Sequence, residues 1–165
     1  MNRIARFESV SETQFATAWA DTFGAEAVVP PLPPLPRRAT AGSAGYDFFT
    51  PCAVRLAPGE TAKIPTGVRV RMEEGWVLQI YPRSGLGFSY RLQLNNTVGI
   101  IDSDYYFSNN EGHIFIKITN DSNEGKILQL QTGDGFAQGI FVPFGITEDD
   151  NAVAIRNGGF GSTSK

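Results

Sequence analysis

The chain has 165 residues, the length of one ordinary domain, and 41% of them are hydrophobic, which excludes a disordered chain. Its formal net charge is −3 and its basic residues form no run, which argues against nucleic acid as a partner. The single cysteine, Cys52, excludes an intrachain disulfide, and no apolar stretch is long enough to span a bilayer. Because the N-terminal segment MNRIARFESVSE has no apolar signal-peptide core, we expect a cytoplasmic protein.

The first predicted element is a helix between Ser11 and Gly24. Ser11 and Gln14 form a capping-box pattern, in which side chains satisfy the free N–H groups at a helix start. Three aromatic residues spaced four apart then give one apolar stripe: Phe15, Trp19 and Phe23. Gly24 is expected to end the helix, which places it at residues 12–23.

A proline-rich segment, VVPPLPPLPRR at 28–38, follows this helix, and its prolines favour an extended polyproline conformation. The helix and the prolines together form an insertion over residues 11–36. We expect this insertion to pack on the domain's own surface. The alternative is a docking arm for a protein partner.

The remaining chain is dominated by short runs that alternate apolar and polar residues between glycine and proline turns. These runs are GVRVRM (67–72), WVLQIY (76–81), HIFIKIT (113–119) and KILQLQ (126–131). A period of two in short segments is typical of β-strands. The sequence therefore predicts an all-β sandwich or barrel.

One acid, Asp47, lies among apolar neighbours in AGSAGYDFFT (41–50). A carboxylate that is buried must be hydrogen-bonded or lie near a cation. The alternative interpretation is an aspartate that caps a turn.

A candidate anion-binding stretch, YPRSGLGFS at 81–89, begins where a strand is expected to give way to a glycine-rich turn. The guanidinium of Arg83 matches phosphate oxygens, and Ser84 adds a hydroxyl. Gly85 and Gly87 let the backbone approach a ligand closely. The alternative is an ordinary loop with a surface arginine.

A candidate general base follows in NNTVGIIDSDYYF (95–107). Asp102 comes directly after apolar residues, so we expect it to point inward or into a protected cleft, where a carboxylate can deprotonate water. Tyr105 offers a flat ring three residues later. The alternative is an Asp-Ser-Asp turn between strands.

Two further stretches complete the candidate site. In TGDGFAQGIF (132–141), Asp134 and Gly135 indicate a turn, and Gln138 needs a partner if it is buried. The chain ends in NGGFGSTSK (157–165) after Arg156; such glycine-rich backbone can wrap phosphate while Phe160 stacks on a base. We therefore expect residues 157–165 to be a lid that becomes ordered over a nucleotide.

His113 is the only histidine of the chain, and Cys52 is the only other soft ligand. Together they give no pattern for a structural zinc site. We expect a structural role for His113 and a packing role for Cys52.

Taken together, five of these stretches resemble the five motifs of the trimeric deoxyuridine triphosphatase (dUTPase) family, in the family's order: AGYD, PRSGLG, GIIDSDY, GDGFAQ and GGFGST. The resemblance covers about residues 39–164. The stretch DYYFSNNEGHIF is similar to the subset of the family with Asp-Tyr-Tyr and an Asn-Glu-Gly-His insertion.

The resemblance implies a jelly-roll-like β-barrel formed by residues 1–156, with one short N-terminal helix insertion, followed by the lid at 157–165. It implies a homotrimer with active sites at subunit junctions. The implied reaction is hydrolysis of dUTP to dUMP and pyrophosphate, with Mg²⁺ bound mainly by the substrate phosphates.

The resemblance also implies a role for each matching residue. Asp102 is similar to the base that activates water, and Asp47 to an acid that contacts the metal through water. Tyr105 resembles the tyrosine beneath the deoxyribose. The uracil hairpin corresponds to Asn96, Gly99 and Ile100. The phosphate contacts correspond to Arg83, Ser84, Gly85 and Gln138, and the closing tail to Arg156, Phe160, Gly161, Ser162 and Thr163.

Two alternative functions stay open at this stage. A dCTP deaminase shares the fold, but its chemistry needs a further acid/base residue near the cytosine amino group, and no glutamate in the equivalent region fits that role. A trimeric regulatory protein could use the nucleotide site as a switch, with residues 11–36 as its partner surface.

Overall fold

The computed structural model describes residues 2–156 and residue 158. Strands dominate these residues, as predicted. The strands are β1 (Ala5–Ser9), β2 (Arg37–Arg38), β3 (Tyr46–Phe49), β4 (Val54–Leu56), β5 (Thr61–Pro65), β6 (Val68–Met72), β7 (Trp76–Pro82), β8 (Gln93–Leu94), β9 (Gly99–Ile101), β10 (Phe115–Thr119), β11 (Leu128–Leu130) and β12 (Gly135–Pro143). The helices are α1 (Glu12–Phe23), α2 (Ser84–Tyr90) and the 3₁₀-helix η1 (Ser103–Phe107).

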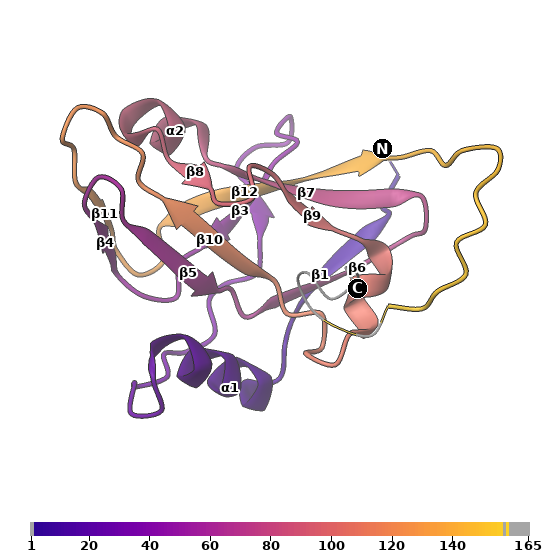
Figure 1. The fold of residues 1–165 in the computed structure, drawn as a ribbon, viewed down its shortest axis with the longest axis horizontal. Helices are drawn as coiled ribbons and strands as arrows, with labels where there is room; N and C mark the ends of the chain where they lie inside the picture. Colours follow the sequence, from indigo (N-terminus) through magenta and orange to yellow (C-terminus); the bar gives the residue numbers. More distant parts are fainter. Residues whose placement is uncertain (1, 157, 159–165) are drawn as a thin grey trace.

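Two sheets form the body of the molecule (Figure 1). The larger has the strand order β2-β3-β12-β7-β9, and the smaller β5-β10-β8. The pairs β1-β6 and β11-β4 extend this framework, and every pairing is antiparallel. This is a jelly-roll arrangement, and it confirms the predicted all-β fold class.

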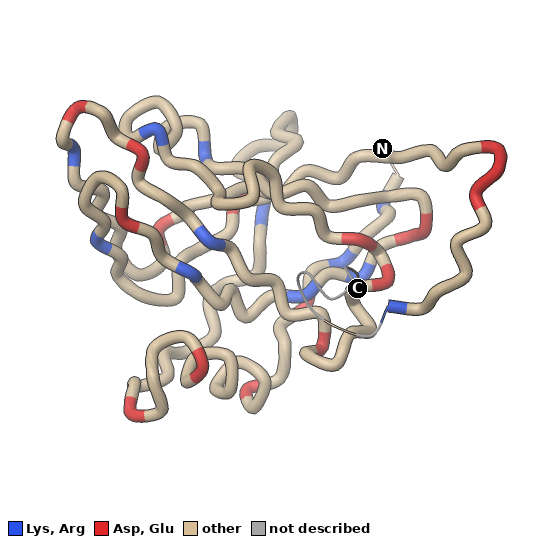
Figure 2. Tube along the Cα trace, viewed as in Figure 1, with Lys and Arg blue, Asp and Glu red and all other residues tan. Residues whose placement is uncertain are grey.

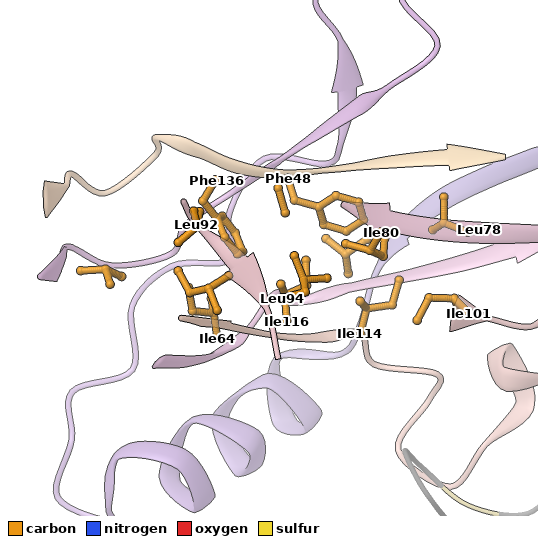
Figure 3. Close-up of a cluster of buried hydrophobic side chains, with 14 of the residues drawn as sticks. Phe48, Ile64, Leu78, Ile80, Leu92, Leu94, Ile101, Ile114, Ile116 and Phe136 are labelled. Carbon is orange, nitrogen blue, oxygen red and sulfur yellow. The ribbon is translucent and has the colours of Figure 1, made fainter. Parts of the chain in front are cut away.

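The core lies between the two sheets, as Figure 3 shows. Phe48, Ile80 and Phe136 come from the larger sheet, and Ile64 and Ile116 face them from the smaller one; each is buried. The predicted alternation is confirmed in β6, where the inward side chains are buried and Arg69 and Arg71 point outward. Apolar burial on this scale is the main source of the fold's stability.

The predicted N-terminal helix is confirmed as α1. Ser11 accepts a hydrogen bond from the Gln14 backbone N–H, and the Gly24 N–H ends the helix on the Ala20 carbonyl. Phe15 is buried in a second apolar cluster, formed with Val10 and Trp19. Phe23, the last member of the predicted stripe, has 45% of its surface exposed and stacks on Trp19.

The proline-rich segment lies on the domain's own surface with one edge inward. Burial recurs every third residue: Pro30 and Pro33 are half-buried and Pro36 is buried. The neighbouring edge, which includes Val28, Pro31 and Pro34, is exposed. A period of three is that of a polyproline helix. The docking role of residues 11–36 stays a prediction.

The prediction of a glycine-rich turn after the strand at 76–81 is wrong, because a helix follows this strand. Residues Ser84–Tyr90 form the helix α2, which starts after the extended Arg83 and ends at the left-handed Arg91. Gly85 and Gly87 each cost a helix about 1 kcal/mol relative to alanine, and for that reason the sequence favoured a turn. The extra helix places Arg83 and Ser84 at its start.

His113 occupies a buried structural position, as expected, at the junction of β6, α1 and β10. Its Nε2 atom accepts a hydrogen bond from the Gly67 backbone N–H at 2.8 Å. The ring is fully buried and lies against Phe15 and Phe115. Burial lowers the pKa of His113 to about 4. The imidazole is therefore neutral in the folded protein at physiological pH.

This burial predicts a pH dependence of stability. Between its ordinary pKa of 6.5 and the folded value of about 4, His113 takes up a proton in the unfolded chain only. The free energy of unfolding should therefore fall as pH decreases through this window, by about 3 kcal/mol in total. Urea denaturation across the window measures it. His113→Gln keeps an acceptor for Gly67 and should flatten the dependence; an unchanged slope in that variant contradicts the assignment.

Figure 2 shows Lys and Arg positions interspersed with Asp and Glu positions along the chain, which agrees with the small net charge. None of the helices in the described part of the chain is long and apolar enough to cross a membrane.

Candidate active site

Asp102 lies at the end of β9, as the N-terminal flanking residue of η1. Its side chain is 45% exposed, so the expectation of a protected position is not met within one chain. Arg156 approaches from the C-terminal segment and bridges two carboxylates. Its Nη2 donates to Asp102, and its Nε donates to Asp104 at 2.9 Å. Figure 1 shows this segment returning beside η1.

Tyr105 lies in η1 and is buried. Its hydroxyl donates to the His113 carbonyl at 2.7 Å and accepts from Asn110 Nδ2 at 2.8 Å. Burial raises the pKa of Tyr105, so the phenol is neutral at physiological pH. Two hydrogen bonds therefore hold the phenol oxygen of Tyr105 in place.

A pocket of about 420 Å³, called the hairpin pocket below, opens beside the hairpin-like turn between β8 and β9, which an isolated bridge from Leu94 to Thr97 closes. Of the predicted uracil-binding residues, Asn96 and Gly99 line it. Ile100 does not line it and is 49% exposed, because successive residues of β9 face opposite sides. Thr97 turns the hairpin with φ +67°, which leaves the backbone of this turn in one defined shape.

The residues predicted to bind phosphate gather at the other end of β7. Arg83 Nε lies 3.2 Å from the Asp47 carboxylate, which is 17% exposed, so this acid lies near a cation, one of the two arrangements expected for it. Arg83, Ser84 and Gly85 line a pocket of about 370 Å³, together with Asp134 at the turn before β12. The Arg83 guanidinium and the Ser84 hydroxyl are the hydrogen-bond donors that this pocket offers to an anion.

Gln138 on β12 has the partner that its position demands. Its Nε2 donates to the Pro82 carbonyl at 3.1 Å. A Cβ atom on Gly45 would lie 2.4 Å from Gln138 Oε1, and one on Gly135 would lie 2.8 Å from Arg83 Nη1. These two glycines make room for the polar side chains. The sequence signalled them only through the motifs AGYD and GDGFAQ.

The structure does not bring the two halves of the predicted site together within one chain. Ile101 on β9 pairs with Leu78 on β7. Arg83 follows Leu78 by five residues, which corresponds to roughly 16 Å of extended strand. Asp102 lies beyond Ile101, on the side away from Arg83. One chain therefore presents Asp102 with the hairpin pocket at one place and the Arg83 guanidinium at another.

Several residues at the hairpin pocket carry no sequence pattern that would have indicated their role there. Lys63, Lys117, Asn95 and Asn110 line it. Lys63 and Lys117 are directly opposite each other on β5 and β10. The signal for Asn110 was present in the Asn-Glu-Gly-His stretch, but its function was not evident from residue types. The predicted tail residues Phe160, Gly161, Ser162 and Thr163 lie outside the described residues.

The fold and these two groups of residues define a class: a jelly-roll protein with an exposed carboxylate beside one pocket and an arginine with a serine hydroxyl at another. Comparisons with known proteins specify it further. A family model described as dUTPase matches residues 33–164. The deoxyuridine 5'-triphosphate nucleotidohydrolase of Lactococcus lactis subsp. lactis is 42% identical over 132 residues, which cover 78% of this chain and 87% of that protein. The Escherichia coli enzyme of the same name is 39% identical over 141 residues, covering 80% and 88%.

Solved structures agree. The dUTPase from Streptococcus mutans has a TM-score of 0.64 and 32% identity, and the match covers 86% of this chain and 98% of that one. The dUTPase from phage phi11 of S. aureus has a TM-score of 0.65 and 25% identity over 91% of this chain and 96% of that one. The chain belongs to the dUTPase family.

Proposed function

We propose that the protein hydrolyses dUTP to dUMP and pyrophosphate and so limits the incorporation of uracil into DNA. The observation that carries the proposal is the position of Asp102. Its half-exposed carboxylate follows β9 directly, beside a pocket that Asn96 and Gly99 line. In this role Asp102 accepts a proton from the water that attacks the α-phosphorus.

The hairpin pocket is proposed to hold the nucleoside. Asn96 and the hairpin backbone up to Ile100 supply donors and acceptors for the uracil edge, and Tyr105 forms the floor under the deoxyribose. A pocket that hydrogen-bonds one base edge rejects the reversed pattern of cytosine strongly. Rejection of thymine depends on the lack of space for one methyl group.

The phosphates need positive charge, because the protein itself is acidic and a triphosphate is strongly anionic. Arg83, Ser84, Gly85 and Gln138 are proposed to bind them. In the substrate complex Arg156 moves from the carboxylates of Asp102 and Asp104 to the phosphates. This movement frees Asp102 to act as a base, and residues 157–165 then close over the nucleotide.

Mg²⁺ is proposed as the cofactor, and the donors that are present fit it. Among the described residues no three His, Cys, Asp or Glu side chains form a cluster that could hold a metal. Mg²⁺ commonly binds through one or two carboxylates, water and substrate phosphates, so a single acid is sufficient. Asp47, which pairs with Arg83, is the acid proposed to contact it through water. When bound, the ion neutralises phosphate charge.

The complete site is proposed to form between subunits of a homotrimer. The support is the separation of Asp102 from Arg83 along β7 and β9. A single copy cannot place both at one α-phosphate, whereas a closed ring of copies places the base of one chain beside the phosphate group of another.

The lone Cys52 supports the proposed cytoplasmic location.

The proposal is tested by release of pyrophosphate from dUTP, dTTP, dCTP and UTP with Mg²⁺, and with a chelator as the control. We expect turnover of dUTP at least about 100-fold above that of dCTP, because the base edge is reversed. Chelation should remove most of the activity. Equal turnover of all four nucleotides, or ammonia release from dCTP, would overturn the assignment.

A further inference from the structure

We propose that the loop Asn110–His113, fastened by Glu111 to the start of α1, positions the Tyr105 ring and thereby sets the preference for deoxyribose over ribose. Asn110, Glu111 and Ser11 are then positioning residues that act through Tyr105. The inference rests on the proposed function and gives a role to the N-terminal insertion and to the Asn-Glu-Gly-His stretch together.

The loop holds the Tyr105 hydroxyl from two sides. Asn110 Nδ2 donates to it at 2.8 Å, and it donates to the His113 carbonyl at 2.7 Å. The same Asn110 side chain accepts from the Gly112 N–H at 3.2 Å through Oδ1, and Asn110 also lines the hairpin pocket. Both ends of this amide are therefore used, and its position fixes the phenol oxygen.

The backbone of the loop is strained and closely packed. Glu111 has φ +60°, an uncommon value for a residue with a side chain, and Gly112 has φ +71°. A Cβ atom on Gly112 would lie 2.7 Å from Tyr106 Cα and 2.8 Å from the Tyr105 carbonyl oxygen. Such a conformation persists only where surrounding contacts determine it.

Glu111 supplies the contact that links this loop to α1. Its carboxylate accepts from the Ser11 backbone N–H at 2.8 Å and from Ser11 Oγ at 2.7 Å. In a capping box the helix's own third residue, here Gln14, would bond the Ser11 N–H. Instead a residue one hundred positions away takes that place, and these bonds lower the pKa of Glu111.

The start of α1 is a firm anchor for the loop. Val10 and Phe15, on either side of Ser11, are buried, and the Val10 N–H donates to the Gly67 carbonyl at 3.0 Å. A second link runs in parallel, because the Tyr106 hydroxyl donates to Glu8 on β1 at 2.8 Å. Tyr105 is therefore linked to the N-terminal segment in two ways. One link runs through the loop that carries Asn110 and Glu111 to Ser11, and the other runs through Tyr106 to Glu8.

This arrangement has a consequence for selectivity. A ring that excludes a ribose 2′-hydroxyl by contact does so only while it is held in place, and misplacement by about 1 Å can cost 100-fold in rate. Loosening the ring should admit ribose more than it harms deoxyribose. The measurable effect is therefore a change in the ratio of kcat/KM for dUTP to kcat/KM for UTP.

The test replaces Asn110 by alanine and uses Asn109→Ala as the matched control, because Asn109 is an exposed neighbour of the same type. We expect Asn110→Ala to lower the dUTP/UTP ratio of kcat/KM by about tenfold, mainly through better use of UTP, and Asn109→Ala to leave it unchanged. Glu111→Ala removes both bonds to Ser11 and should lower the ratio by about threefold, whereas Ser11→Ala keeps the backbone N–H bond to Glu111 and should lower it less. The double variant should lower the ratio no further than Glu111→Ala alone, because both changes act on one link.

A second readout does not depend on turnover. With 3-fluorotyrosine incorporated and the Tyr105 ¹⁹F signal assigned from Tyr105→Phe, Asn110→Ala should shift that signal and Asn109→Ala should not. An unchanged signal and an unchanged ratio in a folded Asn110→Ala protein overturn the inference. A wild-type protein that does not hydrolyse dUTP overturns the proposed function, and the ¹⁹F signal then still decides whether the loop positions Tyr105.

Discussion

Replacing Asp102 by asparagine should lower kcat for dUTP by about 10²–10⁴-fold, the usual contribution of a positioned general base. Asparagine keeps the shape of the side chain but cannot accept the proton of water. The Kd of a non-hydrolysable dUTP analogue should stay within about threefold, because the loss falls on the transition state. Pre-steady-state pyrophosphate release measures the chemical step directly. Asp104→Asn, which removes the other carboxylate bonded by Arg156, should cause a far smaller loss.

The Asp102→Asn chain also tests where the complete site forms. Arg83→Ala should be nearly inactive for a different reason, since it removes the phosphate ligand. If each site takes its base and its arginine from different chains, refolding the two inactive variants together should restore about a quarter of the sites. No restored activity would place both residues in one subunit, and would contradict the proposed inter-subunit site. Unchanged turnover of Asp102→Asn alone would remove Asp102 from the role of base.

Replacing Gly112 by alanine should lower the free energy of unfolding by about 3 kcal/mol or more. The new methyl group would meet the Tyr106 backbone at 2.7 Å and the Tyr105 carbonyl at 2.8 Å, and backbone atoms cannot step aside as side-chain ends do. Because η1 also follows Asp102, we expect activity to fall with stability. Urea denaturation and dUTP turnover at a temperature where the variant is folded separate the two effects.

Gly125→Ala is the matched control for Gly112→Ala. Gly125 has the same φ of +71°, but a Cβ atom there would meet nothing within 4 Å. It should lose only the intrinsic cost of a left-handed residue, about 1–2 kcal/mol. The difference between the variants then measures the backbone clash. Equal losses at both positions would show that the loop yields, and that the packing around Tyr105 is softer than described.

The elements that could be predicted from sequence are those in which local pattern and burial agree. The alternation of Val68, Val70 and Met72 predicted β6, and all three are buried. Ser11 and Gly24 marked both ends of α1. Helix α2 could not be predicted in the same way, because its glycines oppose helix formation locally and only its place after β7 supports it.

The residue types of the candidate site could be predicted from the sequence, but the positions of these residues relative to one another could not. A buried Asp47 was expected to be hydrogen-bonded or to lie near a cation, and Arg83 is that cation. The bond from Ser11 to Glu111 joins residues one hundred positions apart, and no spacing rule reveals such a pair. For the same reason the distance between Asp102 and Arg83 along β7 emerged only from the strand register.

The prolines between α1 and β2 also affect the chain before it folds. Proline fixes φ in the unfolded ensemble as well as in the native state, so residues 30–36 lose less conformational entropy on folding than an ordinary linker would. Ordering this segment on folding therefore costs little conformational free energy, and its outward edge takes no part in the core. Val28, with 89% of its surface exposed, lies beside this edge and offers an attachment point for a fluorophore or surface tether.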